Sequence, residues 1–174
     1  MKIIVCGAGS VGRSIVGYLT QGNNDIVVID HDAKALDVIA KEYDIQPVFG
    51  EAAHPDILEK AGAENADILI AATDCDEVNM VACEVAAALF NVPKKIARID
   101  AQDYLSPLWG TLFNDKHIPV DLVISPDRAI ARAILSLLRF RALPRPYLCS
   151  GRPHVCSLFA AMTKPRLSGR RCHI

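Results

Sequence analysis

Six short apolar runs recur along the first 140 residues, and a longer segment separates each run from the next. The runs show little polar alternation, which predicts strands that are buried on both faces. The longer segments repeat apolar residues at helical spacing, so a helix is expected between successive strands. This alternation predicts an α/β fold with a doubly wound, mostly parallel sheet of about six strands. The expected strands are residues 3–6, 26–29, 46–49, 68–72, 95–99 and 122–124.

The expected helices are residues 10–19, 33–43, 55–61, 76–90 and 127–140, with a broken helix at residues 104–113. The helix at 76–90 is predicted from an apolar stripe made of Val78, Val81, Val85 and Leu89. Ser125 is expected to cap the last helix, and Pro126 to be its first residue. The apolar residues of that helix are expected to cover the sheet or to form a dimer surface; they are Ile130, Ile134, Leu137 and Leu138.

The segment from Gly7 to Gly12 has the spacing G-x-G-x-x-G, directly after the first expected strand and at the start of the first expected helix. In that position the motif indicates a nucleotide-binding turn of the Rossmann type. Gly7 is expected to allow the tight turn, Gly9 to let a pyrophosphate approach the main chain, and Gly12 to let the helix pack closely. The helix begins with Ser10 and Val11, whose main-chain N–H groups are expected to face the phosphates.

An acidic residue, Asp30, ends the second expected strand, 18 residues after Gly12. A carboxylate at this position accepts hydrogen bonds from an adenine ribose. Because the same carboxylate would repel a ribose 2′-phosphate, the sequence favours NAD or an ATP-like ligand over NADP. His31 follows and is expected to assist.

Three further polar residues follow the later strands. Thr73 and Asp74 come after the fourth expected strand, and Arg98 lies near the end of the fifth. Ligands of open α/β sheets bind beyond the carboxyl ends of the strands, so Thr73 and Asp74 are expected near the ligand. For Arg98 three alternatives stay open: pairing with a phosphate, pairing with an acid of a neighbouring subunit, or exposure to solvent.

The composition changes sharply near residue 140. Residues 141–174 contain seven Lys and Arg and no Asp or Glu, whereas residues 1–140 carry all 20 acidic residues. We therefore divide the chain into a nucleotide-binding domain, residues 1–140, and a basic tail, residues 141–174. The tail is interpreted as non-native or disordered sequence, and the alternative is a basic segment that binds acidic partners.

The whole chain carries a net charge of −1, which gives no reason to expect nucleic acid or an anionic membrane as a partner. No apolar run approaches the ~20 residues that a membrane-spanning helix needs, and the apolar start is too short for a signal peptide. We therefore expect a cytoplasmic protein whose six cysteines are reduced. The cysteines include no C-x-x-C pair, so no metal site is expected.

Five segments carry a family resemblance: IIVCGAGSVG, VVIDHD, FGEAAHPDILEKAGAENADILIAATDCDEVNMVAC, IARI and DLVISPDRAIARAI. Together they resemble the TrkA family, the regulatory subunits of Trk-type potassium uptake, whose nucleotide-binding domains are also named KTN or RCK domains. The resemblance covers residues 1 to about 140. Its specific part runs from Gly50 to Cys83.

The resemblance implies a cytoplasmic regulatory subunit that forms a dimer or ring beneath a membrane potassium channel or transporter. It implies NAD(H), or alternatively ATP and ADP, as ligands whose identity shifts the gate. By position, Glu51 and Ala52 would lie near the adenine, and Arg98 would reach a ligand phosphate. Glu51 stands where the family usually has Asp, so its carboxylate reaches one methylene further.

Catalysis is not expected, because a dehydrogenase needs a proton-transfer group beside the nicotinamide. None of the four tyrosines has a Lys four residues later, which is the pattern of short-chain dehydrogenases. Two alternatives remain open at this point. One is a small or truncated NAD-dependent oxidoreductase without its substrate domain, and the other is a pure interaction module.

Overall fold

The computed structural model describes residues 1–106, 108, 111–114 and 117–141. Six parallel strands form one sheet in the order β3-β2-β1-β4-β5-β6, which confirms the predicted fold class. The strands are β1 (Lys2–Cys6), β2 (Asp25–Asp30), β3 (Gln46–Phe49), β4 (Ile68–Ala71), β5 (Lys94–Arg98) and β6 (Leu122–Ile124). The helices are α1 (Ser10–Leu19), α2 (Ala33–Glu42), α3 (Pro55–Lys60), the 3₁₀ turn η1 (Ala63–Asn65), α4 (Asp76–Phe90) and α5 (Pro126–Arg141).

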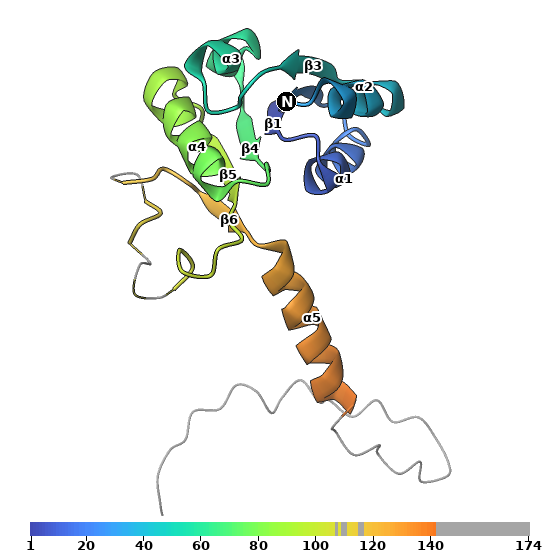
Figure 1. Ribbon diagram of the computed structural model, residues 1–174, viewed down its shortest axis with the longest axis vertical. Helices are drawn as coiled ribbons and strands as arrows, with labels where there is room; N and C mark the ends of the chain where they lie inside the picture. The colour runs from blue at the N-terminus through green and yellow to red at the C-terminus, as the bar shows by residue number, and fades with distance from the viewer. Residues whose placement is uncertain (107, 109–110, 115–116, 142–174) are drawn as a thin grey trace, which may run out of the picture.

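The sheet lies between two layers of helices. Helices α1 and α2 cover one face, and α3 and α4 cover the other (Figure 1). Successive residues of β1 serve the two faces in turn, since Ile4 packs with α3 and α4 whereas Ile3 and Val5 pack with α1 and α2. Full burial of such a side chain stabilises the fold by ~1.5–3 kcal/mol. The lack of polar alternation in the strands therefore reflects cover on both faces.

The chain winds outward from β1 in both directions, because β1 pairs with β2 on one side and with β4 on the other. Val5 lies between Val28 and Ile70 in this register. The helices that follow β1 and β4 consequently leave on opposite faces of the sheet (Figure 1). This divergence opens a crevice beyond the carboxyl ends of the two strands, where open α/β sheets bind ligands.

Helix α4 begins and ends at the predicted residues, but its apolar stripe of Val78, Val81, Val85 and Leu89 is not the face that is fully buried. Val81 and Leu89 are 46% and 59% exposed. The face against the sheet instead carries Asn79, Cys83 and Ala86, all with no exposed surface. Small side chains allow the helix to pack close to β4 and β5, so size outweighed hydrophobicity in choosing the face.

The broken helix predicted at 104–113 is not continuous among the described residues, of which Leu108 alone has 3₁₀-helical conformation. The chain forms turns there, in which Leu105 N–H donates to the carbonyl of Gln102 and Ser106 N–H to that of Asp103. Phe113 then forms an isolated bridge to Ile118. The apolar side chains of this segment still pack against the core without a continuous helix; they are Tyr104, Leu105, Phe113 and Ile118.

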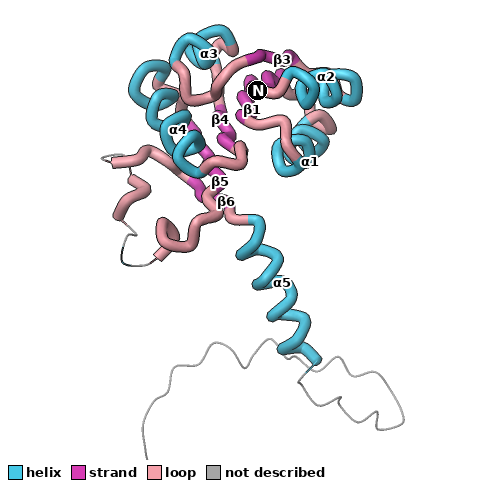
Figure 2. Tube along the Cα trace, in the orientation of Figure 1, coloured by secondary structure: helices cyan, strands magenta, loops and turns pink. Residues whose placement is uncertain are grey.

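Helix α5 leads away from the sheet (Figure 2), so the expectation that its apolar residues cover the sheet is wrong for Ile130, Ile134 and Leu137, whose side chains are described. Ile130, Ile134 and Leu137 are more than half exposed. At its start the carbonyl of Ser125 accepts from Ala129 N–H, but the buried Ser125 hydroxyl has no hydrogen-bond partner, so the predicted side-chain cap is absent. Within the described residues no helix is long and apolar enough to cross a membrane. Of the predicted tail, residues 141–174, Arg141 is the last residue of α5 and residues 142–174 lie outside the described residues.

Candidate nucleotide-binding site

The turn between β1 and α1 has the geometry that the glycine spacing predicts. Gly7 has a φ of +105°, a conformation that residues with a Cβ rarely adopt. A Cβ on Gly12 would lie 1.9 Å from the carbonyl oxygen of Gly7, so only glycine lets α1 pack this close to β1. A Cβ on Gly9 would meet nothing within 4 Å. The open space at Gly9 lies where the motif brings a pyrophosphate to the main chain.

The carboxylate of Asp30 is already bonded to the main chain on both oxygens. Oδ2 accepts from the N–H of Ala8 in the glycine turn at 2.5 Å, and Oδ1 accepts from the N–H of Asp32 at 2.7 Å. The imidazole Nδ1 of His31 lies 3.5 Å from Oδ1. Because each carboxylate oxygen has two lone pairs, Asp30 retains acceptor capacity for a ribose hydroxyl. Through its bond to Ala8, Asp30 also fixes the position of the glycine turn. Its place at a strand end did not reveal this role.

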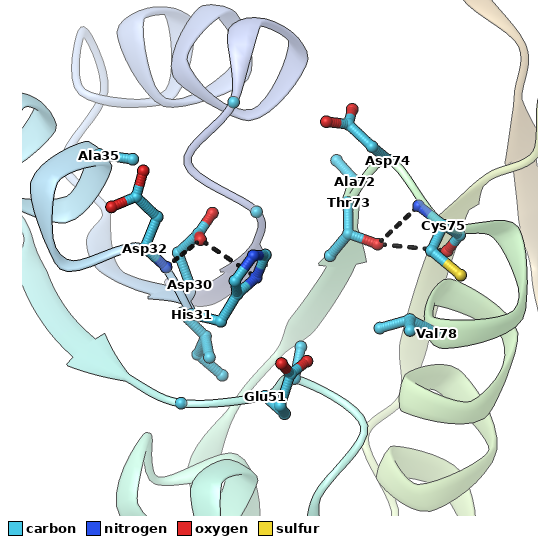
Figure 3. A pocket seen from close by; sticks show the side chains of 15 residues that line it. Asp30, His31, Asp32, Ala35, Glu51, Ala72, Thr73, Asp74, Cys75 and Val78 are labelled. Atoms are coloured by element: carbon cyan, nitrogen blue, oxygen red, sulfur yellow. Dashed lines mark hydrogen bonds and ion pairs between the residues drawn. The ribbon is translucent and has the colours of Figure 1, made fainter.

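A cavity of about 470 Å³ lies beyond the carboxyl ends of β1, β2, β3 and β4. Figure 3 shows Asp30, His31 and Asp32 on one side, Thr73, Asp74 and Cys75 on the other, and Glu51 between them. Eight of the predicted site residues line the cavity: Gly7, Gly9, Asp30, His31, Glu51, Ala52, Thr73 and Asp74. Four others, Ser10, Val11, Gly12 and Arg98, are not among the described residues that line it.

The cavity lining is acidic, and the positively polarised start of α1 lies at the cavity's edge. Among the described lining residues four are Asp or Glu and none is Lys or Arg. Helix α1 starts at the edge of the cavity, and no side chain caps its first N–H groups. Those free donors and the helix dipole favour a negative group at this end of α1. A phosphate is thus attracted by the turn and repelled by the acidic lining.

Arg98 is bound to two carboxylates at the end of β5. Its Nη1 lies 2.8 Å from Asp74 Oδ1, and its Nη2 lies 2.5 Å from Asp100 Oδ2. Burial by itself lowers the pKa of Arg98, but its hydrogen bonds with Asp100 and Asp74 outweigh that effect and raise the pKa above its ordinary value. The guanidinium therefore stays charged, and one of its two partners, Asp74, lines the cavity.

Sequence reasoning missed Asn79, which organises this side of the cavity. Its Oδ1 accepts from the N–H and the hydroxyl of Thr73, at 2.9 and 2.7 Å. Its Nδ2 donates to the carbonyls of Thr73 and Arg98, at 3.1 and 2.9 Å. The only available signal was a lone amide inside the apolar spacing of an expected helix. A buried amide is stable only with such partners, so its position predicts a structural network.

Asp76 adds a second link between α4 and β5. Its carboxylate accepts from the N–H groups of Asp100 and Ala101, at 2.8–3.1 Å. The segment after β4 and the segment after β5 are therefore joined through the first turns of α4. Within the described residues, no three His, Cys, Asp or Glu side chains are grouped to hold a metal ion.

The sequence model of the TrkA-N domain matches residues 3–126. The chain belongs to the TrkA-N domain family. This result confirms the resemblance carried by the segments around the glycine turn and α4. The chain is 45% identical over 138 residues to the Trk system potassium uptake protein TrkA of Azorhizobium caulinodans, and 44% identical over 140 residues to that of Vibrio alginolyticus. These matches cover 79% and 80% of this chain, but only 30% of the length of each relative.

Solved structures share the fold of this TrkA-N domain. The TrkA-N domain of the inner membrane protein ybaL of Escherichia coli superposes with a TM-score of 0.68 at 25% identity, over 79% of this chain and 96% of that one. The GsuK channel bound to NAD gives a TM-score of 0.63 at 17% identity, over 76% and 23% of the two chains. GsuK bound to ADP gives 0.61 at 19% identity, over 76% and 33%.

Proposed function

We propose that this TrkA-N domain is the nucleotide-sensing part of a regulatory subunit of a potassium uptake system. The observation that carries the proposal is the cavity beside the glycine turn, with Asp30 at its edge. A phosphate chain fits the open space at Gly9 and the free N–H groups of α1, while Asp30 accepts from the ribose. The family and its relatives in Trk potassium uptake support the regulatory context.

The proposed ligand is NAD(H), with ATP or ADP as the alternative. GsuK, which shares this fold, has been solved with NAD and with ADP. Glu51 and Ala52 line the cavity after β3 and are proposed to contact the adenine. Arg98 is proposed to reach a ligand phosphate, which requires it to leave Asp74. Catalysis is not part of the proposal, because the domain acts by holding the nucleotide.

The proposed partner is a membrane potassium channel or transporter, with the domain at the cytoplasmic face as part of a homo-oligomer. Helix α5 supports an oligomer, because it leaves the sheet with Ile130, Ile134 and Leu137 exposed on it. A second copy that covers these side chains would remove apolar surface from water. A dimer through this helix is therefore the proposed unit of assembly.

Regulation of this kind requires the ligand to bind one state of the assembly more tightly than the other. A near-complete switch needs ~5.5 kcal/mol of preference in total. Several identical sites can share that preference, so each domain need contribute only part of it. The proposal therefore requires both a nucleotide that binds in the cavity and an oligomer in which several such cavities act together.

The test is a calorimetric titration of the full chain with NADH, NAD⁺, NADPH, ATP and ADP. Binding of NADH, NAD⁺ or the adenine nucleotides, with little binding of NADPH, is the expected result. Binding of none of the five would refute the proposal. Oxidation of NADH by the chain with a small-molecule acceptor would support an oxidoreductase in its place.

A further inference from the structure

The acidic lining of the cavity contains one carboxylate that differs from the others. Asp74 lines the cavity and is 91% exposed, yet it also forms an ion pair with Arg98. The other carboxylates that line the cavity, Asp30, Asp32 and Glu51, form no ion pair with a Lys or Arg among the described residues. The Arg98 guanidinium is therefore held by a side chain that lines the cavity.

Arg98 has reason to exchange partners. Its side chain is only 16% exposed, and its buried Nε has no hydrogen-bond partner in this position. A buried donor without a partner is unfavourable, and a guanidinium satisfies several donors at once on a phosphate. The carboxylates of Asp74 and Asp100 and a ligand phosphate are thus competing acceptors for the same cation.

The main chain on both sides of this ion pair is fixed. Asn79 holds Thr73, the residue before Asp74, through three hydrogen bonds, and holds the carbonyl of Arg98 through a fourth. Only the side chains of Asp74 and Arg98 remain to rearrange. A ligand phosphate near Asp74 consequently meets a negative charge at a defined place.

We propose that Asp74 determines nucleotide specificity in this domain by repelling highly charged phosphate chains and by competing with the ligand phosphate for Arg98. The inference rests on the proposed nucleotide site and concerns which nucleotide that site binds more tightly. ATP carries several more negative charges than NAD⁺, so the same carboxylate costs ATP more binding free energy. The domain with Asp74 in place is therefore a dinucleotide site first and an ATP site second.

Substitution of Asp74 by Asn removes the repulsion and leaves Arg98 with Asp100 as its one remaining ion-pair partner among the described residues, while the shape of the side chain at position 74 is unchanged. For a difference of several charges near an exposed carboxylate, we expect ATP to gain about 10-fold in affinity relative to NAD⁺. The gain should shrink as the salt concentration rises, because ions screen exposed charges. Arg98→Gln combined with Asp74→Asn should give a smaller gain than Asp74→Asn alone.

The experiment measures the dissociation constants of NAD⁺ and ATP for the full 174-residue chain by calorimetry, in buffer with EDTA and without magnesium. The variants are Asp74→Asn, the double variant Asp74→Asn/Arg98→Gln, and Glu84→Gln. Glu84 is exposed on α4 and does not line the cavity. Glu84→Gln therefore removes the same single negative charge as Asp74→Asn, but away from the proposed ligand. Thermal unfolding of each variant verifies that it folds.

A rise in the ATP preference for Asp74→Asn, with Glu84→Gln within about 2-fold of the original ratio, supports the inference. Three results would overturn the inference without refuting the nucleotide site. They are an unchanged ratio of ATP to NAD⁺ affinity in Asp74→Asn, an equal change of that ratio in Glu84→Gln, and loss of all nucleotide binding in Asp74→Asn alone. Failure of the unmodified chain to bind either nucleotide would instead refute the proposed function, and the inference with it.

Discussion

Asp30 and Ala8 are 22 residues apart in the sequence, yet the Asp30 carboxylate accepts the main-chain N–H of Ala8 at 2.5 Å. The bond joins the end of β2 to the glycine turn after β1. A residue expected only to bind ribose therefore also holds the turn that is proposed to bind phosphate. Loss of its charge should affect both stability and affinity.

Asp30→Asn is expected to weaken NADH binding about 10-fold and to lower the free energy of unfolding by ~1–2 kcal/mol. The amide keeps the size of the side chain but replaces one acceptor oxygen by a donor that faces other donors. Calorimetry and urea unfolding measure the two effects. Asp25→Asn, at the exposed start of β2, is the control and should change the free energy of unfolding by less than ~0.5 kcal/mol. Unchanged NADH affinity in Asp30→Asn would contradict the ribose role.

Alanine substitutions at Gly12 and Gly9 should affect different properties, stability for Gly12 and nucleotide binding for Gly9. Gly12→Ala places a Cβ 1.9 Å from the Gly7 carbonyl oxygen and is expected to destabilise the fold by ~3 kcal/mol or more. Gly9→Ala has open space for its Cβ, so its free energy of unfolding should lie within ~1 kcal/mol of that of the original chain. Its methyl group occupies the place of the phosphate, so nucleotide binding should fall. Normal binding in Gly9→Ala would show that the phosphate lies elsewhere.

Asn79→Leu is expected to lower the free energy of unfolding by ~2–4 kcal/mol, because it leaves the partly buried N–H of Thr73 and the carbonyls of Thr73 and Arg98 without their Asn79 partner. Urea unfolding measures the loss. Val81→Ala on the exposed face of the same helix should cost less than ~1 kcal/mol. Similar losses in the two variants would mean that the amide network contributes little.

The pair of Lys95 and Asp121 should make stability depend on pH in the acid range. Burial raises the pKa of Asp121, but hydrogen bonds from the Lys95 N–H and ammonium outweigh it, so the pKa lies below 3.8. A lowered pKa stabilises the fold above the unfolded value, and that stabilisation is lost as the pH falls through the folded value. The stability difference between the original chain and Asp121→Asn should therefore be largest at pH 5 and above and shrink below pH 4. Urea unfolding measures this difference in the free energy of unfolding at each pH. A difference that stays constant from pH 6 to pH 3 would rule out this linkage.

The described cysteines should differ in reactivity towards iodoacetamide. Burial raises the pKa of Cys83 to about 12, and burial together with the nearby Cys83 raises the pKa of Cys6, so both thiols stay protonated. Cys75 is exposed and lines the cavity. Mass spectrometry of alkylated peptides at pH 8 should find Cys75 modified at least ~10-fold faster than Cys6 and Cys83. Saturating NADH should slow the reaction at Cys75, and modification unaffected by any bound nucleotide would place the ligand away from this wall.

Local features of the sequence were enough for the fold and for most of the cavity lining. Apolar runs without alternation identify strands covered on both faces, and the glycine spacing locates the turn, because both effects act within a few residues. Asp30, Thr73 and Asp74 could be placed near the cavity because parallel strands bring their carboxyl ends to one edge. The edge strand β3 and the order of the helices followed from the same patterns.

Tertiary contacts decided the remainder. The buried face of α4 depended on how closely its small residues approach β4 and β5, so the valine stripe misled, and Asn79 was not recognised. Arg98 could be assigned no partner until β5 lay beside β4, where Asp74 and Asp100 bind it. The sequence by itself determined which segments become strands, helices and turns, since periodicity and main-chain freedom are local. Only the folded chain decided which charges meet, because ion pairs depend on distances between residues far apart along the chain.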